Sequence, residues 1–275
     1  MKKSVLFIIL LLCSFSIILT ACGNTVEADS SSALPPNHKY VSEKQENTQP
    51  IVIENDSSRK SSSSTMNANL TKTTSSHTLK LLDVPLIKQR PELPSGCEAV
   101  ALTMALRYYG INIDKAKIAS QMPRDNTPLT KNADGTVKTW GDPEVGFIGD
   151  PYGAGITINP NPLKQVLDRY RSDGLALYGK DFSVIQDYVA KGKPVLVWFT
   201  ITHELPTPRV WVTPDGKRIS SPRPLHCIVV TGADNDWVYF NDSESTPLSG
   251  KNVKVKKDKF IQIYNAMGRR ALVVN

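Results

Sequence analysis

One polar tract restricts folding to part of the chain. Residues 23–77 are rich in Ser, Thr, Asn and Gln, and they carry almost no periodic apolar pattern. Such a stretch buries too little apolar surface to offset the entropy lost on ordering, so we expect a flexible spacer. Residues 78–275 have the patterns of a folded unit, and no second spacer of similar length interrupts them. The sequence therefore predicts one folded domain over residues 78–275.

The N-terminal segment reads as a targeting signal. A basic start precedes an almost wholly apolar run over residues 4–18, which is too short and wrongly flanked for a membrane span. The run ends in Leu19-Thr20-Ala21-Cys22-Gly23, which resembles a bacterial lipobox. We expect a lipoprotein signal peptide over residues 1–21, a lipid attached to Cys22, and a tether over 22–77. The lipid anchor would hold the protein on the extracytoplasmic face of the bacterial cell membrane. An ordinary cleaved signal with an incidental cysteine is the alternative.

Charge and motifs exclude several classes of function. The formal net charge is +7, and the basic residues of the domain are scattered apart from the run at 251–257. A charge run is usually a solvated face, and no nucleic-acid motif accompanies it, so we expect no nucleic-acid partner. The phosphate-binding pattern GxxxxGK[ST] is absent. His203 and Glu204 lack further ligands at a recognised spacing, so we expect neither metal nor cofactor.

Periodicity and helix caps predict an α+β domain, with helices near its N-terminus packed on a largely antiparallel C-terminal sheet. Segments 123–160 and 202–225, rich in Pro, Gly and Trp, are expected as long loops. The expected helices cover residues 99–109, 114–121, 161–170, 182–190 and 256–267, and the expected strands cover 195–201, 226–231, 237–241 and 271–274.

Cys97 is the cysteine best placed for chemistry. Among the four cysteines, Cys13 lies in the signal and Cys22 is the lipid site, which leaves Cys97 and Cys227. The segment Ser95-Gly96-Cys97-Glu98 has the form of a capping box and places Cys97 in the first turn of a helix. Unpaired N–H groups and the helix dipole stabilise an anion there, which favours a nucleophilic thiolate. A disulfide with Cys227 is the structural alternative.

A thiol nucleophile needs a base and donors for the oxyanion. His226 begins a strand that turns back through Asn241 and Asp242. Pairing residue 226 with residue 242 would place His226 and Asp242 on one face, whereas a one-residue shift would offer Asn241 instead. The backbone N–H of Cys97 and the side-chain amide of Gln89 are candidate oxyanion donors. The residues alone leave the choice between Asp242 and Asn241 open.

Together these segments resemble the bacterial papain-like peptidases of cysteine peptidase family thirty-nine, the double-glycine leader peptidase-like group. The resemblance rests on the segments 83–89, Pro91 to Glu98, and Tyr108-Tyr109-Gly110. It also rests on the strand His226 to Gly232 and on Tyr239-Phe240-Asn241-Asp242. It implies a papain-like fold.

The resemblance also implies roles for four residues. Cys97 would be the nucleophile, His226 the base and acid, Asp242 the orienting carboxylate and Gln89 the oxyanion donor. The family often has Asp-Pro where this chain has Asp242-Ser243. Leader-peptide trimming is not implied, because the chain lacks the membrane and ATP-binding fusions of the founding members.

The sequence thus predicts a lipid-anchored thiol hydrolase of peptide or amide bonds. Its substrate would be a peptide or protein, with cell-wall peptide among the candidates. Two other functions stay open. One is acyl transfer to an amine, as in transglutaminase-like enzymes, and the other is a non-catalytic surface binding module.

Overall fold

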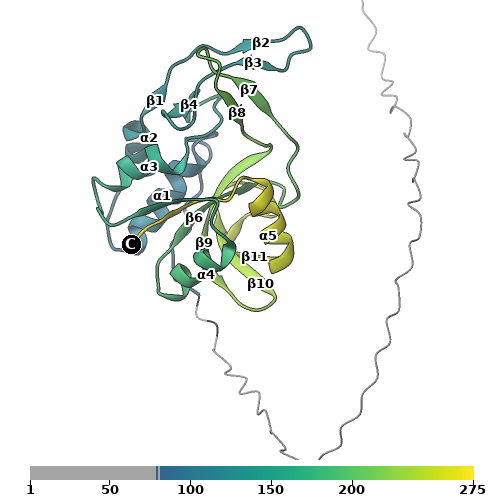
Figure 1. Ribbon diagram of the computed structural model, residues 1–275. Coiled ribbons are helices and arrows are strands. Elements are labelled where there is room, and N and C mark those ends of the chain that lie inside the picture. The colour runs from purple at the N-terminus through teal and green to yellow at the C-terminus, as the bar shows by residue number, and fades with distance from the viewer. Residues whose placement is uncertain (1–78, 80) are drawn as a thin grey trace, which may run out of the picture. The chain divides into compact units, whose positions relative to one another are not determined.

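The centre of the molecule is a six-stranded antiparallel sheet (Figure 1). The computed structural model describes residue 79 and residues 81–275, so the predicted signal peptide, Cys22 and the tether lie outside the described residues. The strand order is β11-β10-β9-β6-β12-β5. These strands are β5 (Leu175–Tyr178), β6 (Val195–Thr200), β9 (Leu225–Ala233), β10 (Trp237–Asp242), β11 (Gly250–Lys256) and β12 (Arg270–Val273).

Helices cover both faces of this sheet. Trp198 of β6 donates to the carbonyl of Ile158 on the side of α1, whereas its neighbour Phe199 stacks on Phe260 of α5 with ring centroids 4.6 Å apart. Successive side chains of a strand point to opposite faces, so every residue of β6 is buried. The helices are α1 (Cys97–Tyr108), α2 (Lys115–Gln121), α3 (Pro160–Leu167), α4 (Phe182–Ala190) and α5 (Lys257–Ala266).

Burial of β6 on both faces explains its near-continuous apolar sequence. Each fully buried side chain of the size of Phe stabilises the fold by about 1.5–3 kcal/mol.

The five helices and the antiparallel sheet confirm the predicted α+β class. None of the helices among residues 81–275 has the length and apolar character needed to cross a membrane.

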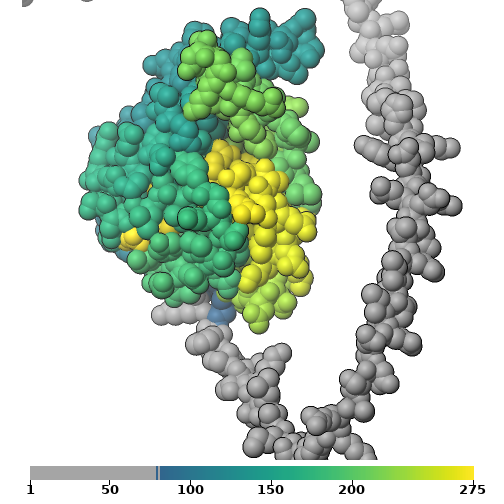
Figure 2. Space-filling view, in the orientation of Figure 1, coloured from purple at the N-terminus to yellow at the C-terminus, as the bar shows by residue number. Residues whose placement is uncertain are grey.

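The two segments expected as long loops contain strands. Four of these strands form a separate sheet in the order β2-β3-β7-β8, and Figure 2 shows the teal and green atoms of these segments together at one end of the folded unit. Its strands are short, and β3 pairs with β7 across 70 intervening residues, which sequence periodicity does not reveal. The strands of these two segments are β1 (Arg124–Asp125), β2 (Thr130–Lys131), β3 (Val137–Thr139), β4 (Phe147–Ile148), β7 (Val210–Val212) and β8 (Arg218–Ser220).

The expected capping box does not form. The N-cap of α1 is Gly96, with no side-chain cap hydrogen bond. The hydroxyl of Ser95 instead donates to the carbonyl of Gly153 at 2.7 Å, and Glu98 is buried against Thr157. Both side chains bind the segment before α3 rather than the helix end. They therefore connect residues 153–157 to the start of α1.

Two other expected features at helix starts shift. The third helix begins at Pro160 rather than after Asn161, because Pro160 fits the first turn, where no N–H is needed. Asp181 occupies the N-cap of α4 but makes no cap hydrogen bond, and it pairs instead with Arg269 at 2.8 Å. Asp114 caps α2 as expected, accepting from the backbone N–H of Ala116 at 2.7 Å.

Candidate active site

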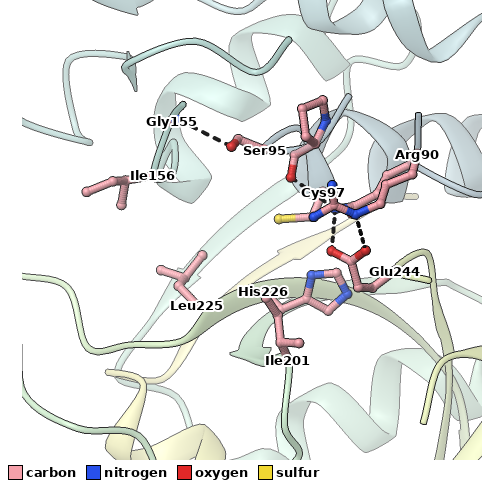
Figure 3. Close-up of a pocket in the computed structure, with 11 residues that line it drawn as sticks. Arg90, Ser95, Cys97, Gly155, Ile156, Ile201, Leu225, His226 and Glu244 are labelled. Carbon is pink, nitrogen blue, oxygen red and sulfur yellow. Dashed lines mark hydrogen bonds and ion pairs between the residues drawn. The ribbon is translucent and has the colours of Figure 1, made fainter. Parts of the chain in front are cut away.

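A pocket opens where the N-terminal end of α1 meets the start of β9 (Figure 3). Cys97 contributes from the first position of α1, His226 from β9, and Gln89 from the segment that precedes α1. The structure thus brings three of the four predicted catalytic side chains to one cavity. Asp242, the fourth, lies behind His226 and is fully buried.

The pocket has one apolar side and one charged side. Figure 3 shows Ile156 and Leu225 on one side of the space below Cys97, with Arg90 and Glu244 across from them. Arg90 and Glu244 form an ion pair at 2.7 Å. An extended substrate entering this space would meet aliphatic surface on one side and charged groups on the other.

Asp242 binds His226 directly. Oδ1 of Asp242 lies 2.7 Å from Nε2 of His226, and both side chains are buried. The strand register differs from the expected one, because Asn241 lies opposite Val229, and continuing that pairing places residue 242 opposite 228. His226 is then the diagonal neighbour of Asp242. A shift of two residues keeps both side chains on the same face, so the contact forms despite the wrong register.

Asn241 is engaged elsewhere. Its side-chain amide donates to the carbonyl of Val84 at 2.8 Å, and its oxygen accepts from the backbone N–H of Asn252 at 2.9 Å. These contacts tie β10 to the segment before α1 and to β11. Of the two residues that the sequence left open, Asp242 is therefore the one that contacts His226.

The carboxylate determines which nitrogen of His226 is basic. Hydrogen bonds from His203 and His226 hold the pKa of Asp242 well below its usual value, although burial opposes this. An ionised carboxylate only accepts hydrogen bonds, so Nε2 of His226 must carry a proton. In the neutral ring Nδ1 is then the unprotonated nitrogen. This tautomer leaves Nδ1 to take a proton from a thiol.

The resting thiol of Cys97 is more basic than the sequence predicts. Burial raises its pKa well above the usual value, and the neighbouring carboxylate of Glu98 adds to the effect. Sγ of Cys97 lies 3.4 Å from Oε2 of Glu98. Burial and the neighbouring carboxylate therefore act against the thiolate stabilisation that is expected at a helix N-terminus. Cys97 and Cys227 are both free thiols, so the alternative disulfide is absent from the described residues.

Gln89 is held by several partners. Its amide nitrogen donates to Oε2 of Glu244 at 2.8 Å, and its oxygen accepts from the hydroxyl of Ser243 at 3.0 Å. The backbone N–H of Gln89 also donates to the carbonyl of Ser243 at 3.0 Å. Ser243 therefore fixes Gln89 through both its hydroxyl and its backbone carbonyl. The predicted oxyanion donor is therefore anchored to the segment that follows Asp242.

Sequence reasoning missed two residues of the site. His203 binds the second oxygen of Asp242 at 3.1 Å, and Glu244 links Gln89 to Arg90. Ligand spacing in the sequence excludes a metal role for His203 and gives no sign of its contact with Asp242, which lies 39 positions further along the chain. No local sequence pattern indicated Glu244, because its partners Gln89 and Arg90 lie 155 and 154 positions away in the chain.

Comparisons with known proteins identify the family of this chain. The model of the Peptidase_C39 like family matches residues 81–272. The uncharacterized protein YvpB of Bacillus subtilis is 34% identical over 200 residues, which cover 71% of this chain and 76% of that protein. A crystal structure from Bacillus anthracis, described as a C39-like peptidase, is 32% identical with a TM-score of 0.61, covering 71% of this chain and 96% of that one. This chain therefore belongs to the Peptidase_C39 like family.

Proposed function

We propose that this protein is a cysteine peptidase that hydrolyses peptide or amide bonds, with Cys97 as nucleophile and His226 as general base and acid. Asp242 orients His226, and the oxyanion donors are Gln89 and the backbone N–H of Cys97. One observation carries the proposal. The Asp242–His226 pair, at 2.7 Å, leaves Nδ1 of His226 as the free base in a pocket that Cys97 also lines.

The reaction has two halves. Nδ1 of His226 takes the proton from the Cys97 thiol, and the thiolate attacks the substrate carbonyl carbon. The tetrahedral intermediate collapses, the carbon–nitrogen bond breaks, and Nδ1–H protonates the departing amine. Water, deprotonated by Nδ1, then attacks the thioester, which releases the carboxylic acid and returns the thiol.

Two groups lower the barrier to these steps. The charge on Asp242 stabilises the imidazolium that forms when His226 accepts the thiol proton, which offsets the raised pKa of Cys97. Gln89 must direct toward the developing oxyanion the N–H that otherwise makes a long hydrogen bond of 3.4 Å to the carbonyl of Pro94. Its anchoring by Ser243 and Glu244 restricts the amide before the substrate arrives.

The proposal extends to where the enzyme works. A lipid on Cys22 would hold the catalytic domain outside the cytoplasmic membrane, where peptides, proteins and cell-wall peptides are accessible. Cys22→Ala should move the protein from the membrane fraction to the soluble extracellular fraction, and mass spectrometry of the mature N-terminus should find the acyl chains only on the unsubstituted chain. An unlipidated wild-type N-terminus would contradict the anchor.

Thiol reactivity tests the catalytic core without a known substrate. We expect iodoacetamide to label Cys97 at pH 6–7 faster than Cys227, which is buried and serves as the internal control. Mass spectrometry of the two cysteine peptides measures both rates in one sample. His226→Ala should remove the advantage of Cys97. Equal labelling of both cysteines in the wild type would favour the binding module over an enzyme.

Hydrolysis and acyl transfer are separated by adding a second nucleophile. An activated acyl ester is incubated with the protein and a primary amine, and the products are resolved by chromatography. A hydrolase releases mainly the free acid even at high amine concentration, whereas a transferase releases mainly the amide. Cys97→Ala is the control for uncatalysed reaction with either nucleophile.

A further inference from the structure

We propose that His203 is a positioning residue of this site, which acts through Asp242 and never touches the substrate. This inference rests on the proposed function, because it concerns the carboxylate that orients His226. The starting observation is that Asp242 lies between two imidazoles. Oδ1 binds Nε2 of His226 at 2.7 Å, and Oδ2 binds Nε2 of His203 at 3.1 Å.

Each oxygen of Asp242 has its own donors. Oδ1 also accepts from the backbone N–H of Glu244 at 2.9 Å, so that side of the carboxylate is held twice. Among residues 81–275, the side chain of His203 is the donor to Oδ2. The terminal torsion of an aspartate is broad and defines no single orientation by itself. His203 is therefore the group that fixes the plane of the carboxylate and keeps Oδ1 directed at His226.

The surroundings of His203 hold it in place. The residue follows β6 in a turn in which its backbone N–H donates to the carbonyl of Thr200. Its ring is buried edge-on to Phe240, with centroids 5.2 Å apart, and lies 5.9 Å from the ring of Phe199. The ring is therefore held between Asp242 and two aromatic side chains. An imidazole held this way has one polar partner among its described neighbours.

The backbone at His203 supports a specific requirement for its side chain. Its φ is 55°, in the left-handed region, where asparagine, aspartate and histidine are the residues most enriched after glycine. Strained backbone of this kind persists where the surrounding structure over-determines it. A glycine would relieve the strain but would leave Oδ2 of Asp242 without its donor. The hydrogen bond to Asp242 explains why a histidine occupies this position.

Two substitutions separate positioning from bulk. His203→Leu keeps apolar volume but removes the donor, whereas His203→Gln can present an N–H close to where Nε2 lies. Both retain a side chain at the left-handed position, so their backbone strain is matched. Glu204→Gln is the control, because Glu204 is in the same turn but pairs with Lys259 at the surface.

The first measurement is nitrogen NMR of the His226 ring in the full-length protein. In the wild type and in His203→Gln we expect the tautomer protonated at Nε2. In His203→Leu we expect a mixture of tautomers. A purely structural residue would not change the tautomer of a folded protein, so an unchanged spectrum in His203→Leu would overturn the proposal whether or not the protein is a peptidase.

The second measurement is the pH profile of Cys97 labelling. His203→Leu should lower the rate at neutral pH by about tenfold and move the profile to higher pH, and His203→Gln should recover most of the rate. Protected Cys227 and an unchanged circular dichroism spectrum check that each variant is folded. Equal losses in both variants would refute positioning. If His226→Ala labelled Cys97 as fast as the wild type does, the proposed function would be refuted. The NMR result would still decide the role of His203.

Discussion

Two fully buried carboxylates, Asp242 and Glu98, lie next to the pocket, and their pKa values are shifted in opposite directions. Asp242 lies between two imidazoles, and hydrogen bonds from His203 and His226 hold its pKa well below the usual value in spite of burial. Glu98 lies beside the Cys97 thiol, and burial raises its pKa. Two carboxylates that are both inaccessible to solvent therefore have pKa values shifted in opposite directions. The donors that each carboxylate meets decide which one stays charged.

The donors explain the difference in detail. Asp242 accepts from two ring nitrogens and one backbone N–H. Glu98 accepts from the hydroxyl of Thr157 at 2.5 Å, from a backbone N–H at 3.4 Å, and from a thiol. Neutral hydroxyl and thiol donors stabilise a charge less than imidazoles, which become cationic on protonation. Asp242 therefore keeps its negative charge behind His226 to low pH, whereas Glu98 beside Cys97 takes up a proton at a higher pH than an ordinary glutamate.

Removing the charge behind His226 should produce the largest effect. Asp242→Asn can donate to Nε2 and so favours the wrong tautomer of His226. We expect labelling of Cys97 at pH 6 to slow by about 10²-fold, since an unassisted thiol is almost wholly protonated there. Asp258→Asn, an exposed change on α5, is the matched control. A labelling rate within twofold of the wild type would show that Asp242 does not govern the thiol.

The same substitution should change the acid sensitivity of the fold. The pKa of Asp242 is depressed in the folded state, so its stabilisation is present above pH 4 and is lost as the pH falls below that value. We expect Asp242→Asn to lower the free energy of unfolding at pH 7 by about 2–3 kcal/mol. The difference in the free energy of unfolding from the wild type should begin to shrink near pH 4 and shrink further as the pH is lowered to 3. Urea unfolding at each pH measures it, and a constant difference would contradict the depressed pKa.

The equivalent change at the other carboxylate should have the opposite sign. The pKa of Glu98 is raised in the folded state, so the fold loses stability as the pH rises from about 4.5 toward that higher value. Glu98→Gln is neutral at every pH, and we expect it to be more stable than the wild type at pH 8 by about 1 kcal/mol.

The gain from Glu98→Gln should vanish below pH 4.5, where both side chains are uncharged. The same variant should label faster at Cys97, because a like charge next to the thiol has been removed. Parallel urea titrations of Glu98→Gln and Asp242→Asn therefore compare one chemical change in two settings. A gain in the free energy of unfolding at pH 8 in both variants would show that burial alone governs the two carboxylates.

Periodicity predicted the part of the fold that carries the site. The helix that begins at Cys97, the buried strand from Val195 and the strand that begins near His226 all have long apolar patterns, and the structure forms them there. The small sheet escaped prediction because its strands have two or three residues. It also pairs segments far apart in the chain, such as Thr139 with Val212.

The electrostatics of the site were less predictable than its residues. A helix N-terminus predicted an acidic thiol at Cys97, but the neighbouring Glu98 turned inward instead of capping the helix. His203 contacts Asp242 across 39 residues, from a turn whose left-handed backbone no local pattern indicates. Sequence spacing identifies candidate groups. The charge state of each group depends on long-range donors that only the fold brings together.

The smallest expected effect isolates one donor of Glu98. The hydroxyl of Thr157 opposes the rise in the pKa of Glu98, and Thr157→Val removes it with little change in shape. The indole of Trp198 keeps its bond to the carbonyl of Ile158 at 3.1 Å. We expect the free energy of unfolding to fall by about 0.5–1 kcal/mol at pH 7, and by less when Glu98 is already Gln.

A double-mutant cycle of Thr157→Val and Glu98→Gln measures that coupling. Carbon NMR of the two carboxyls should show the pKa of Glu98 rising while that of Asp242 stays unchanged. A rise at Asp242 would mean that the two carboxylates share one network, and a zero coupling would mean that Thr157 does not control the proton on Glu98.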